Sequence, residues 1–561
     1  MNPQRLMILL LLGLCLPAAA ADLPRWLKAD VPRAGDEELI FTPAGFDRPG
    51  VPAIATGTNV ATVKVTVRSA ATGRPTFCRV NVIGADGNYY QPATNHLKAY
   101  SLTGTWPKQR AGNRVGKAPV RYFGRFFYST GEFTVKVPAG RTWIEVWKGF
   151  EHRPIRHEVR ASEKIQTAVD LQLERSVNMA AAGWYGGDTH LHFARNTPED
   201  DRMILDLMEA EDVRYAGVLC YNPTGSYAGR MDAQDVPQAR LGMDSLVTRG
   251  DYQIISGQEY RSGQYGHTKV FLADRLVQAG RSYDPNVRPV FGEAVQPVRA
   301  AGGLVFWAHG GYSKEIFADH LLDAVDGVEL LQFGIYRPIG LEGWYHILNI
   351  GHRLPMLGAS DYPACRKLAD CRSYVHLDQP PRMDEWLRAL KAGRSFVTTG
   401  PLLLLEVAGH RPGEVIELDR PETVEAVARV RSEVTPVTHI ELIVNGVVRE
   451  RREVSPAAGR GRWVELRSTL KLTEPAWIAA TAYSLAKTGS PDAEAHTNPV
   501  HVELAGRRPW NDADAAWLLE QLDKRIANHQ KRLTGGDREE VLHYFNRARA
   551  RLVELRAQHA R

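Results

Sequence analysis

The stretch GWYGGDTHLHF, residues 183–193, carries the pattern from which the fold can be inferred. Its apolar start leads into His190 and His192, which lie two residues apart. Because side chains alternate between the two faces of a strand, both imidazoles are expected to project to the same side. Such a pair can form one half of a metal site, although two histidines on one strand face are more often ordinary polar residues.

Short apolar strands alternate with helix-like segments on either side of this stretch, from about residue 180 to 400. Strand followed by helix, repeated, predicts a parallel α/β sheet or barrel, in which functional residues gather where strands end. Further strand ends supply Glu259, His267, His309 and Asp361. Imidazole together with carboxylate suits Zn, Mn or Fe better than Ca or Mg.

The flanking regions have a residue pattern typical of antiparallel strands rather than of alternating strands and helices. Residues 60–178 and 402–506 contain alternating β-branched and aromatic runs, and Asn445-Gly446 is a strong hairpin signal in the second region. We therefore predict two β-sandwiches, of which the first, through GEFTVKVPAG and TWIEVWKGFEHRPI, resembles carboxypeptidase-regulatory-like or prealbumin-like modules. Two helical patterns broken at Gly535-Gly536 predict a helical hairpin over 507–561.

The first 21 residues have the layout of a cleaved signal peptide, with a charge at Arg5, an apolar run Leu6–Leu16 and a small-residue exit Ala18–Ala21. That run is too short for the roughly 20 residues that a membrane span requires. We therefore expect a periplasmic or secreted protein without a membrane span. Residues 22–59 are predicted to be an irregular, Pro-rich segment that precedes the first sandwich.

The composition is that of a folded, globular protein. The chain has 561 residues, of which 44% are hydrophobic and 24% charged, so a disordered or fibrous protein is excluded. Lys and Arg total 70 against 64 Asp and Glu, and no basic block suggests a nucleic-acid partner. Cys365 and Cys371 lie six residues apart, so a disulfide between them is plausible in an oxidising compartment.

The ordered series GDTHLH, GQEY, YGHTKVFL, VFWAHGG, LGASDYP and KAGRSFVTTGP resembles the PHP (polymerase and histidinol phosphatase) superfamily, and within it the CehA/McbA-type metallohydrolases. The resemblance covers residues 183–400. It implies a distorted (β/α)7 barrel over about 179–401, with a metal cluster at its mouth.

The chain departs from complete three-metal members of that superfamily at three stretches, Phe193–Arg195, Leu219–Asn222 and Asp361–Pro363. All three departures would remove the same metal. The resemblance then implies two divalent ions, Zn, Mn or Fe, bridged by Glu259 and a hydroxide, with Glu259 and Asp361 as the catalytic carboxylates. One ion would be held by His190, His192, Glu259 and Asp361, and the other by Glu259, His267 and His309.

Other residues near these strand ends are candidates for supporting roles. Asp188 could orient an imidazole from outside the metal shell, or be an ordinary capping or surface residue. Tyr221 occupies the position of a lost ligand and could contact substrate, or simply fill the space. Arg366 and Lys367 follow Asp361 and could bind phosphate or carboxylate groups, or form loop salt bridges.

Two functions from different classes follow. The first is an exported binuclear-metal hydrolase that cleaves an ester, carbamate or phosphoester bond in a small-molecule or polymer-derived substrate. The alternative is a non-catalytic binding or scaffold protein of the cell envelope with a degenerate PHP barrel. The sequence carries no G-x-S-x-G elbow after a strand and no phosphate-binding glycine motif, so serine-hydrolase and nucleotide chemistry lack support.

Overall fold

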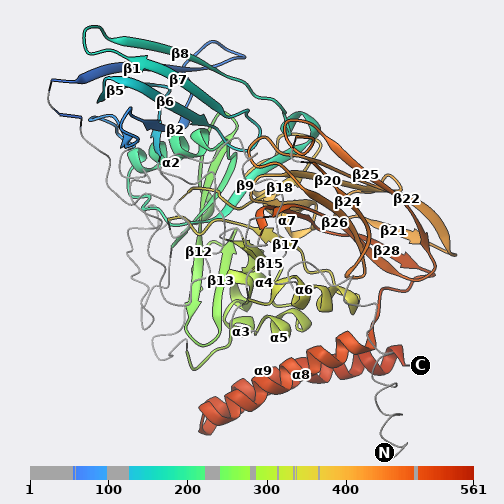
Figure 1. Cartoon of the computed structure of the whole chain (residues 1–561). Coiled ribbons are helices and arrows are strands. Elements are labelled where there is room, and N and C mark those ends of the chain that lie inside the picture. Colours follow the sequence, from blue (N-terminus) through green and yellow to red (C-terminus); the bar gives the residue numbers. More distant parts are fainter. Residues whose placement is uncertain are drawn as a thin grey trace, which may run out of the picture.

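The computed structural model shows a mixed α/β protein dominated by strands in several sheets (Figure 1). It describes residues 55–56, 58–97, 126–220, 241–277, 286–311, 315–332, 335–336, 338–363, 367–455, 457–485 and 491–560. The predicted signal peptide lies outside these residues. Among the helices described, none has both the length and the apolar character needed to cross a bilayer.

The N-terminal region forms two sheets that face each other across an apolar core. In β5 the side chains alternate regularly between exposed and buried, as expected for strands with one face on a core. Val63, Val80, Phe133 and Ile144 are among the residues that fill the space between the sheets. One sheet has the order β5 (Glu132–Pro138), β1 (Val60–Ser69), β8 (Thr167–Leu173), and the other β3 (Tyr89–Tyr90), β2 (Cys78–Ile83), β6 (Gly140–Trp147), β7 (Ile155–Ala161), with β4 (Phe127–Ser129) on β2.

The central region is a run of strands whose order differs from a simple parallel sheet. The run passes from β18 to β9, β10, β12, β13, β14, β15 and β17, and β11 and β16 are attached to its side. The bounds are β9 (Trp184–Leu191), β10 (Tyr215–Cys220), β11 (Gly242–Arg249), β12 (Tyr252–Ser262), β13 (Gly266–Phe271), β14 (Leu304–Trp307), β15 (Gly327–Gln332), β16 (Ile335–Tyr336), β17 (Met356–Gly358), β18 (Arg372–His376) and β19 (Ser395–Thr398).

The expectation of a parallel sheet was wrong for part of this run. The ladders β9–β10, β10–β12, β14–β15 and β15–β17 are parallel, but β12–β13, β13–β14 and β18–β9 are antiparallel. Only three residues, 263–265, join β12 to β13, too few for the crossover that a parallel pair needs.

The two ends of the run meet at a single serine. The Ser373 hydroxyl on β18 donates to the Gly358 carbonyl of β17 at 3.1 Å and accepts from the Gly358 N–H at 3.0 Å. The last strand of the run, β17, therefore lies beside the first, β18. The finer assignment, a distorted (β/α)7 barrel of the PHP type, stays a prediction.

Helices cover the central strands. The first long one begins at a capping box, because the Thr197 hydroxyl accepts from the Asp200 N–H and the Asp200 carboxylate accepts from the Thr197 N–H. The helices of this region are α2 (Pro198–Ala210), α3 (Phe291–Ala294), α4 (Gln296–Ala300), α5 (Ile316–Leu321), α6 (Gly340–Asn349) and α7 (Met383–Lys391), with 3₁₀ turns at Ala180–Ala182 and His309–Gly311.

The C-terminal β region also has two sheets, and one is continuous with the central strands. β27 pairs antiparallel with β19, so the predicted boundary at 401/402 lies between segments that share a ladder. The hairpin predicted at Asn445-Gly446 is present between β23 and β24, with positive φ at both residues. The separate sheet has the order β20 (Leu402–Val407), β22 (Glu422–Arg431), β25 (Val464–Leu472), and the continuous one contains β21 (Val415–Leu418), β23 (His439–Val444), β24 (Val447–Glu453), β26 (Ala476–Leu485), β27 (Pro491–Thr497) and β28 (Val500–Leu504).

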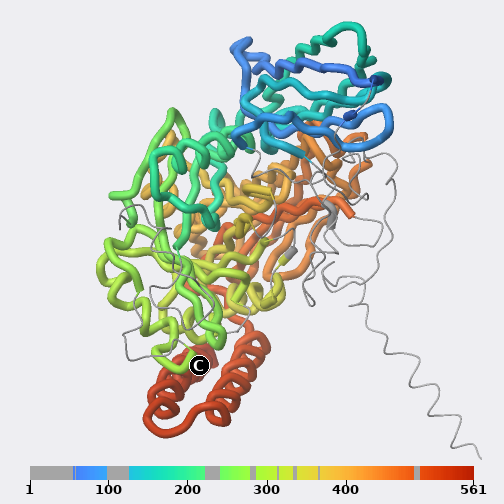
Figure 2. Tube along the Cα trace, turned by 90° about the vertical axis from the view of Figure 1, so that its left-hand side faces the viewer, coloured from blue at the N-terminus to red at the C-terminus, as the bar shows by residue number. Residues whose placement is uncertain are grey.

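The chain ends in two antiparallel helices, α8 (Asp512–Arg532) and α9 (Gly535–His559). Asn511 begins the first by accepting from the Ala513 and Asp514 N–H groups. Figures 1 and 2 show this hairpin against the central region, at the end of the molecule opposite the N-terminal sandwich. Its buried face, including Leu518 and Phe545, joins the same apolar core as Trp307 of β14.

Candidate metal centre

Six side chains that are distant in the sequence converge at the ends of the central strands. The carboxylate of Glu259, on β12, lies in the middle of them. Its Oε1 is 2.9 Å from Nδ1 of His267 and 2.9 Å from Nε2 of His309. The Oε1 atom also lies 3.5 Å from Nε2 of His190, and Oε2 lies 3.3 Å from Nε2 of His192.

Asp361 completes the cluster from the segment after β17. Its Oδ1 lies 3.4 Å from Nε2 of both His190 and His192. Reciprocal backbone bonds place it there, since the Tyr362 N–H donates to the His190 carbonyl and the His192 N–H donates to the Tyr362 carbonyl. Asp361 itself has φ of 57°, in the left-handed region that aspartate tolerates better than most residues.

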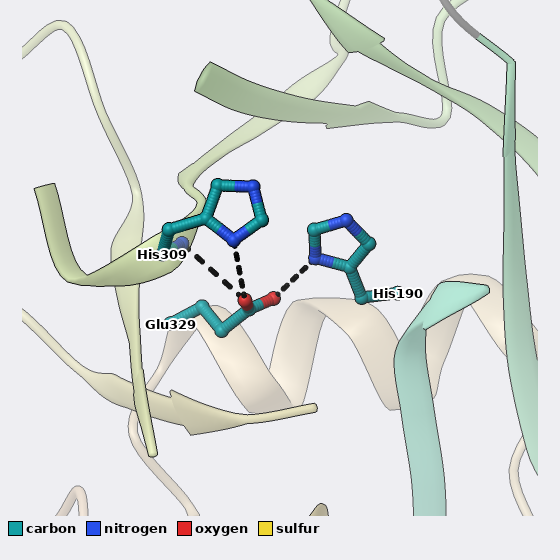
Figure 3. Close-up of side chains that lie close together, drawn as sticks. All are labelled: His190, His309 and Glu329. Carbon is teal, nitrogen blue, oxygen red and sulfur yellow. Dashed lines mark hydrogen bonds and ion pairs between the residues drawn. The ribbon is translucent and has the colours of Figure 1, made fainter. Parts of the chain in front are cut away.

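Three of the imidazoles have an orienting partner at their Nδ1 atom. Nδ1 of His190 lies 2.8 Å from Glu329 Oε2, Nδ1 of His192 lies 3.2 Å from the Leu219 carbonyl, and Nδ1 of His309 lies 3.1 Å from Gln332 Oε1. Figure 3 shows His190 and His309 on either side of Glu329. Because each Nδ1 has an orienting partner, each Nε2 is directed toward the shared carboxylates.

Glu329, which pairs with Lys269 behind the cluster, is a part of this site that the sequence reasoning missed. Both side chains are completely buried, and Lys269 Nζ contacts Glu329 Oε2 and donates to the Thr189 hydroxyl at 2.8 Å. Glu329 Oε1 also accepts from Gln332 Nε2 at 2.8 Å. The available signal was a carboxylate inside the apolar run GVELLQFG, since an ionised side chain in a buried strand needs a partner.

The charges in the cluster perturb one another strongly. Burial lowers the pKa of His190, but the carboxylates of Glu329, Asp361 and Glu259 outweigh it and raise that pKa to about 10. Burial would raise the pKa of Glu259, yet His190 and His267 hold it well below its usual range. The pKa of His267 falls to about 4, because burial outweighs the attraction of Glu259.

Asp188 acts differently from the predicted role of orienting an imidazole. It is buried, and its Oδ1 accepts from the backbone N–H of His190 at 3.0 Å and from the backbone N–H of Ser360 at 3.1 Å. The carboxylate therefore joins the segment that carries the two β9 histidines to the segment that carries Asp361. These two hydrogen bonds hold backbone groups in place and do not contact an imidazole ring.

Lys367 does not face the cluster, which corrects its prediction as a substrate-binding residue. Its side chain is fully buried, with Nζ 3.6 Å from Glu211 Oε2 and over the ring of Phe150. The contact of Lys367 with Glu211 instead agrees with the alternative prediction, a salt bridge. Tyr221, Arg366 and Cys365 lie outside the described residues, so the predicted substrate contacts and the disulfide are not described here.

The donor sets fit a divalent cation. Three groups each offer ligand atoms within 4.8 Å of one another, namely His190, His309 and Glu329; His190, His192 and Glu259; and Glu259, His267 and His309. The buried Nε2 of His190 lies 3.5 Å from Glu259 Oε1 and 3.4 Å from Asp361 Oδ1, so it faces two carboxylates at distances longer than a typical hydrogen bond. A buried imidazole nitrogen with this surrounding is suited to a metal ion.

Exposure shows which side of the cluster is open. The side chains of His190, Glu259 and Glu329 are fully buried, those of His309, His267 and His192 are 9–11% exposed, and those of Asp361 and Arg261 are 14% and 17% exposed. The guanidinium of Arg261 contacts Glu259 Oε2, with Nε at 2.7 Å. Among these side chains Asp361 and Arg261 are the most exposed, so the cluster is more open on their side.

Comparison with known proteins gives limited likenesses. No family model matches the chain, and no curated protein matches it. Among solved structures, PsfC from Pseudomonas syringae is 13% identical over 36% of this chain and 88% of its own, with a TM-score of 0.26. The lesion-specific endonuclease PfuEndoQ from Pyrococcus furiosus is 14% identical over 36% of this chain and 55% of its own, with a TM-score of 0.23.

A superoxide reductase (neelaredoxin) from Ignicoccus hospitalis is 21% identical over 19% of this chain and 82% of its own, with a TM-score of 0.12. These scores are too low to support an argument about function.

Proposed function

We propose that this protein is a metal-dependent hydrolase whose active site is the cluster around Glu259. The observation that carries the proposal is the convergence of two histidine pairs on one buried carboxylate: His190 and His192 on one side, His267 and His309 on the other. Burying so many ionisable side chains together has a desolvation cost, which a bound cation would help to offset.

Each half of the cluster would hold one divalent ion. His190, His192 and Glu259, with Asp361 beside them, form one donor set, and Glu259, His267 and His309 form the other. Glu259 would be shared. Mixed imidazole and carboxylate donors suit Zn, Mn or Fe. When bound, such ions act as Lewis acids and make water a stronger nucleophile near neutral pH.

The protein's own groups would position the reactants. Asp361 is the carboxylate on the open side and would hydrogen-bond the attacking water. Arg261 lies beside Glu259 on the same side, and its guanidinium would bind an anionic or developing-anionic oxygen of the substrate. The fully buried Glu329 would keep His190 and His309 in place throughout.

The residues at the divergent stretches support two ions rather than the three that complete PHP members hold. Phe193, next to His192, stacks on Tyr362, next to Asp361, with ring centroids 5.2 Å apart. Arg195 is bound by Asp201 at 2.6 Å and by the Ser256 hydroxyl at 2.9 Å. Side chains at two of the three divergent stretches are thus occupied with packing and ion pairing, as a site without a third ion requires.

Within the hydrolases, we infer a PHP-type enzyme similar to the CehA/McbA group from the ordered motifs over 183–400. The bond cleaved would be an ester, carbamate or phosphoester. The first 21 residues support export to the periplasm or the medium.

The test is a panel of chromogenic phosphate mono- and diesters, carboxylic esters and carbamates, with added Mn or Zn. We expect hydrolysis of at least one class by the wild-type chain, and loss of that activity in His190→Ala and Glu259→Ala. His157→Ala, on β7 of the N-terminal sandwich, is the matched control and should retain activity. Equal background rates in all four proteins would favour the non-catalytic binding protein instead.

A further inference from the structure

The C-terminal helical hairpin is bonded to the segments that carry two of the histidines. On α9 the Tyr544 hydroxyl donates to Asp319 Oδ1 at 2.7 Å, and Asp319 Oδ2 accepts from Trp307 Nε1 at 2.9 Å. All three side chains are buried, and Trp307 lies two residues before His309. A continuous chain of hydrogen bonds therefore joins the hairpin to the strand end that presents His309.

The close approach of Tyr544 depends on a specific residue in the central region. A Cβ on Gly292 would lie 1.7 Å from the Tyr544 hydroxyl oxygen and 3.0 Å from Asp319 Oδ1. Only glycine leaves room for this contact. The hydrogen bond therefore depends on both helices, because Gly292 on α3 leaves the space and Tyr544 on α9 provides the hydroxyl.

The other helix of the hairpin makes an equivalent contact at the second histidine. Arg532 on α8 donates from one guanidinium nitrogen to the Tyr265 hydroxyl at 3.0 Å and from another to the Asn286 carbonyl at 2.6 Å. Tyr265 is buried and lies two residues before His267. Both histidines of one donor set therefore follow an aromatic residue whose polar atom is linked to the hairpin.

The opposite half of the cluster also lies on paired strands. The strand that carries His190 pairs with β10 on one side and β18 on the other, and the Leu191–Tyr362 bridge fixes the segment of Asp361. Ladder bonds on both sides hold this half, and β13, which carries His267, is likewise paired on both sides. The side-chain contacts with the hairpin are therefore what distinguish the His267–His309 half.

We propose that the α8–α9 hairpin is a positioning element for the His267–His309 half of the metal centre. Tyr544 and Arg532 are the positioning residues, and they act through Asp319–Trp307 and Tyr265. The hairpin would raise the affinity of that half for its ion without touching it. This inference rests on the proposed function, because it requires an ion in that half.

The experiment measures stepwise Co²⁺ binding to the metal-free full chain by calorimetry and visible absorption. Reference variants His190→Ala and His267→Ala assign each binding step to one half of the centre. In Tyr544→Phe and Arg532→Gln we expect the step assigned by His267→Ala to weaken by about 10–100-fold, the usual effect of losing a group that orients a ligand. The step assigned by His190→Ala should be unchanged.

Two further variants keep the test decisive. Gly292→Ala displaces Tyr544 without removing a polar group, so it should weaken the same step even if one of the other variants fails to fold. Arg556→Gln removes an ion pair with Asp512 inside the hairpin, on its exposed side, and should change neither step.

The inference is overturned if the hairpin variants leave both steps unchanged or weaken both equally. A wild-type chain that binds Co²⁺ in both halves would then still support the proposed function. A wild-type chain without any step sensitive to His267→Ala would instead overturn the proposed function of that half together with this inference.

Discussion

Glu329 Oε2 lies 2.8 Å from Nδ1 of His190 and also contacts the ammonium of Lys269. One carboxylate thus orients a candidate ligand and neutralises a buried cation. The two roles can be separated experimentally, because the first affects metal binding and the second affects the stability of the metal-free chain.

Replacing Glu329 by Gln should destabilise the fold. The substitution leaves the Lys269 charge buried without its carboxylate, which typically costs about 3–5 kcal/mol. The double variant Glu329→Gln/Lys269→Met removes both charges and should recover part of the loss. Urea unfolding of the metal-free proteins measures both values, and a single variant as stable as the wild type would contradict the assigned pairing.

The metal-free protein should lose stability at alkaline pH through His190. Its pKa is raised from 6.5 to about 10 in the fold, so the folded state binds the proton more tightly than the unfolded chain does. The resulting stabilisation is complete below pH 6.5 and is lost as the pH rises toward about 10. Denaturant midpoints of the wild type and His190→Gln should therefore differ most at acidic pH and converge at alkaline pH; a constant difference would argue against this titration.

Metal binding should release protons near neutral pH. Because His190 has a raised pKa and a ligand nitrogen must be deprotonated, an ion in that half displaces a proton. His267, with a pKa of about 4, is already neutral and releases none. Calorimetry of Zn²⁺ binding in buffers of different ionisation enthalpy should show proton release that is reduced in His190→Ala but not in His267→Ala. Equal release from all three proteins would refute the assignment.

The two hydrogen bonds accepted by Asp188 predict a contrast between substitutions. Asp188→Asn keeps an oxygen acceptor for the N–H groups of His190 and Ser360, and it removes a buried carboxyl whose pKa burial raises to about 6. The Asn variant should be at least as stable as the wild type at pH 7. Asp188→Ala strands two buried donors and should lose about 1–3 kcal/mol for each. Thermal unfolding at pH 7 distinguishes them, and an unstable Asn variant would show that the negative charge itself is needed.

Period-two alternation predicted that His190 and His192 project to the same side, and the ordered motifs predicted Glu259, His267, His309 and Asp361 as their partners. The structure brings these six side chains together, and their roles as ligands stay a prediction. Glu329 was not predicted, because the search for functional residues considered only the ends of strands, whereas Glu329 lies within β15.

Two other errors have a related cause. Lys367 was selected because it follows Asp361 closely, but nearness along a loop does not determine direction, and its side chain turns toward Glu211. The mixed sheet was missed because the alternation of strands and helices says little about a three-residue turn such as 263–265. Long-range partners decide both outcomes, and no local pattern contains them.

The ladder between β19 and β27 has a consequence for how the molecule melts. Because hydrogen bonds run continuously from the central strands into the C-terminal β region, heat should disrupt both in a single cooperative transition rather than one after the other. A fragment that stops before residue 402 would leave the outer edge of Ser395–Thr398 bare and self-associate through it.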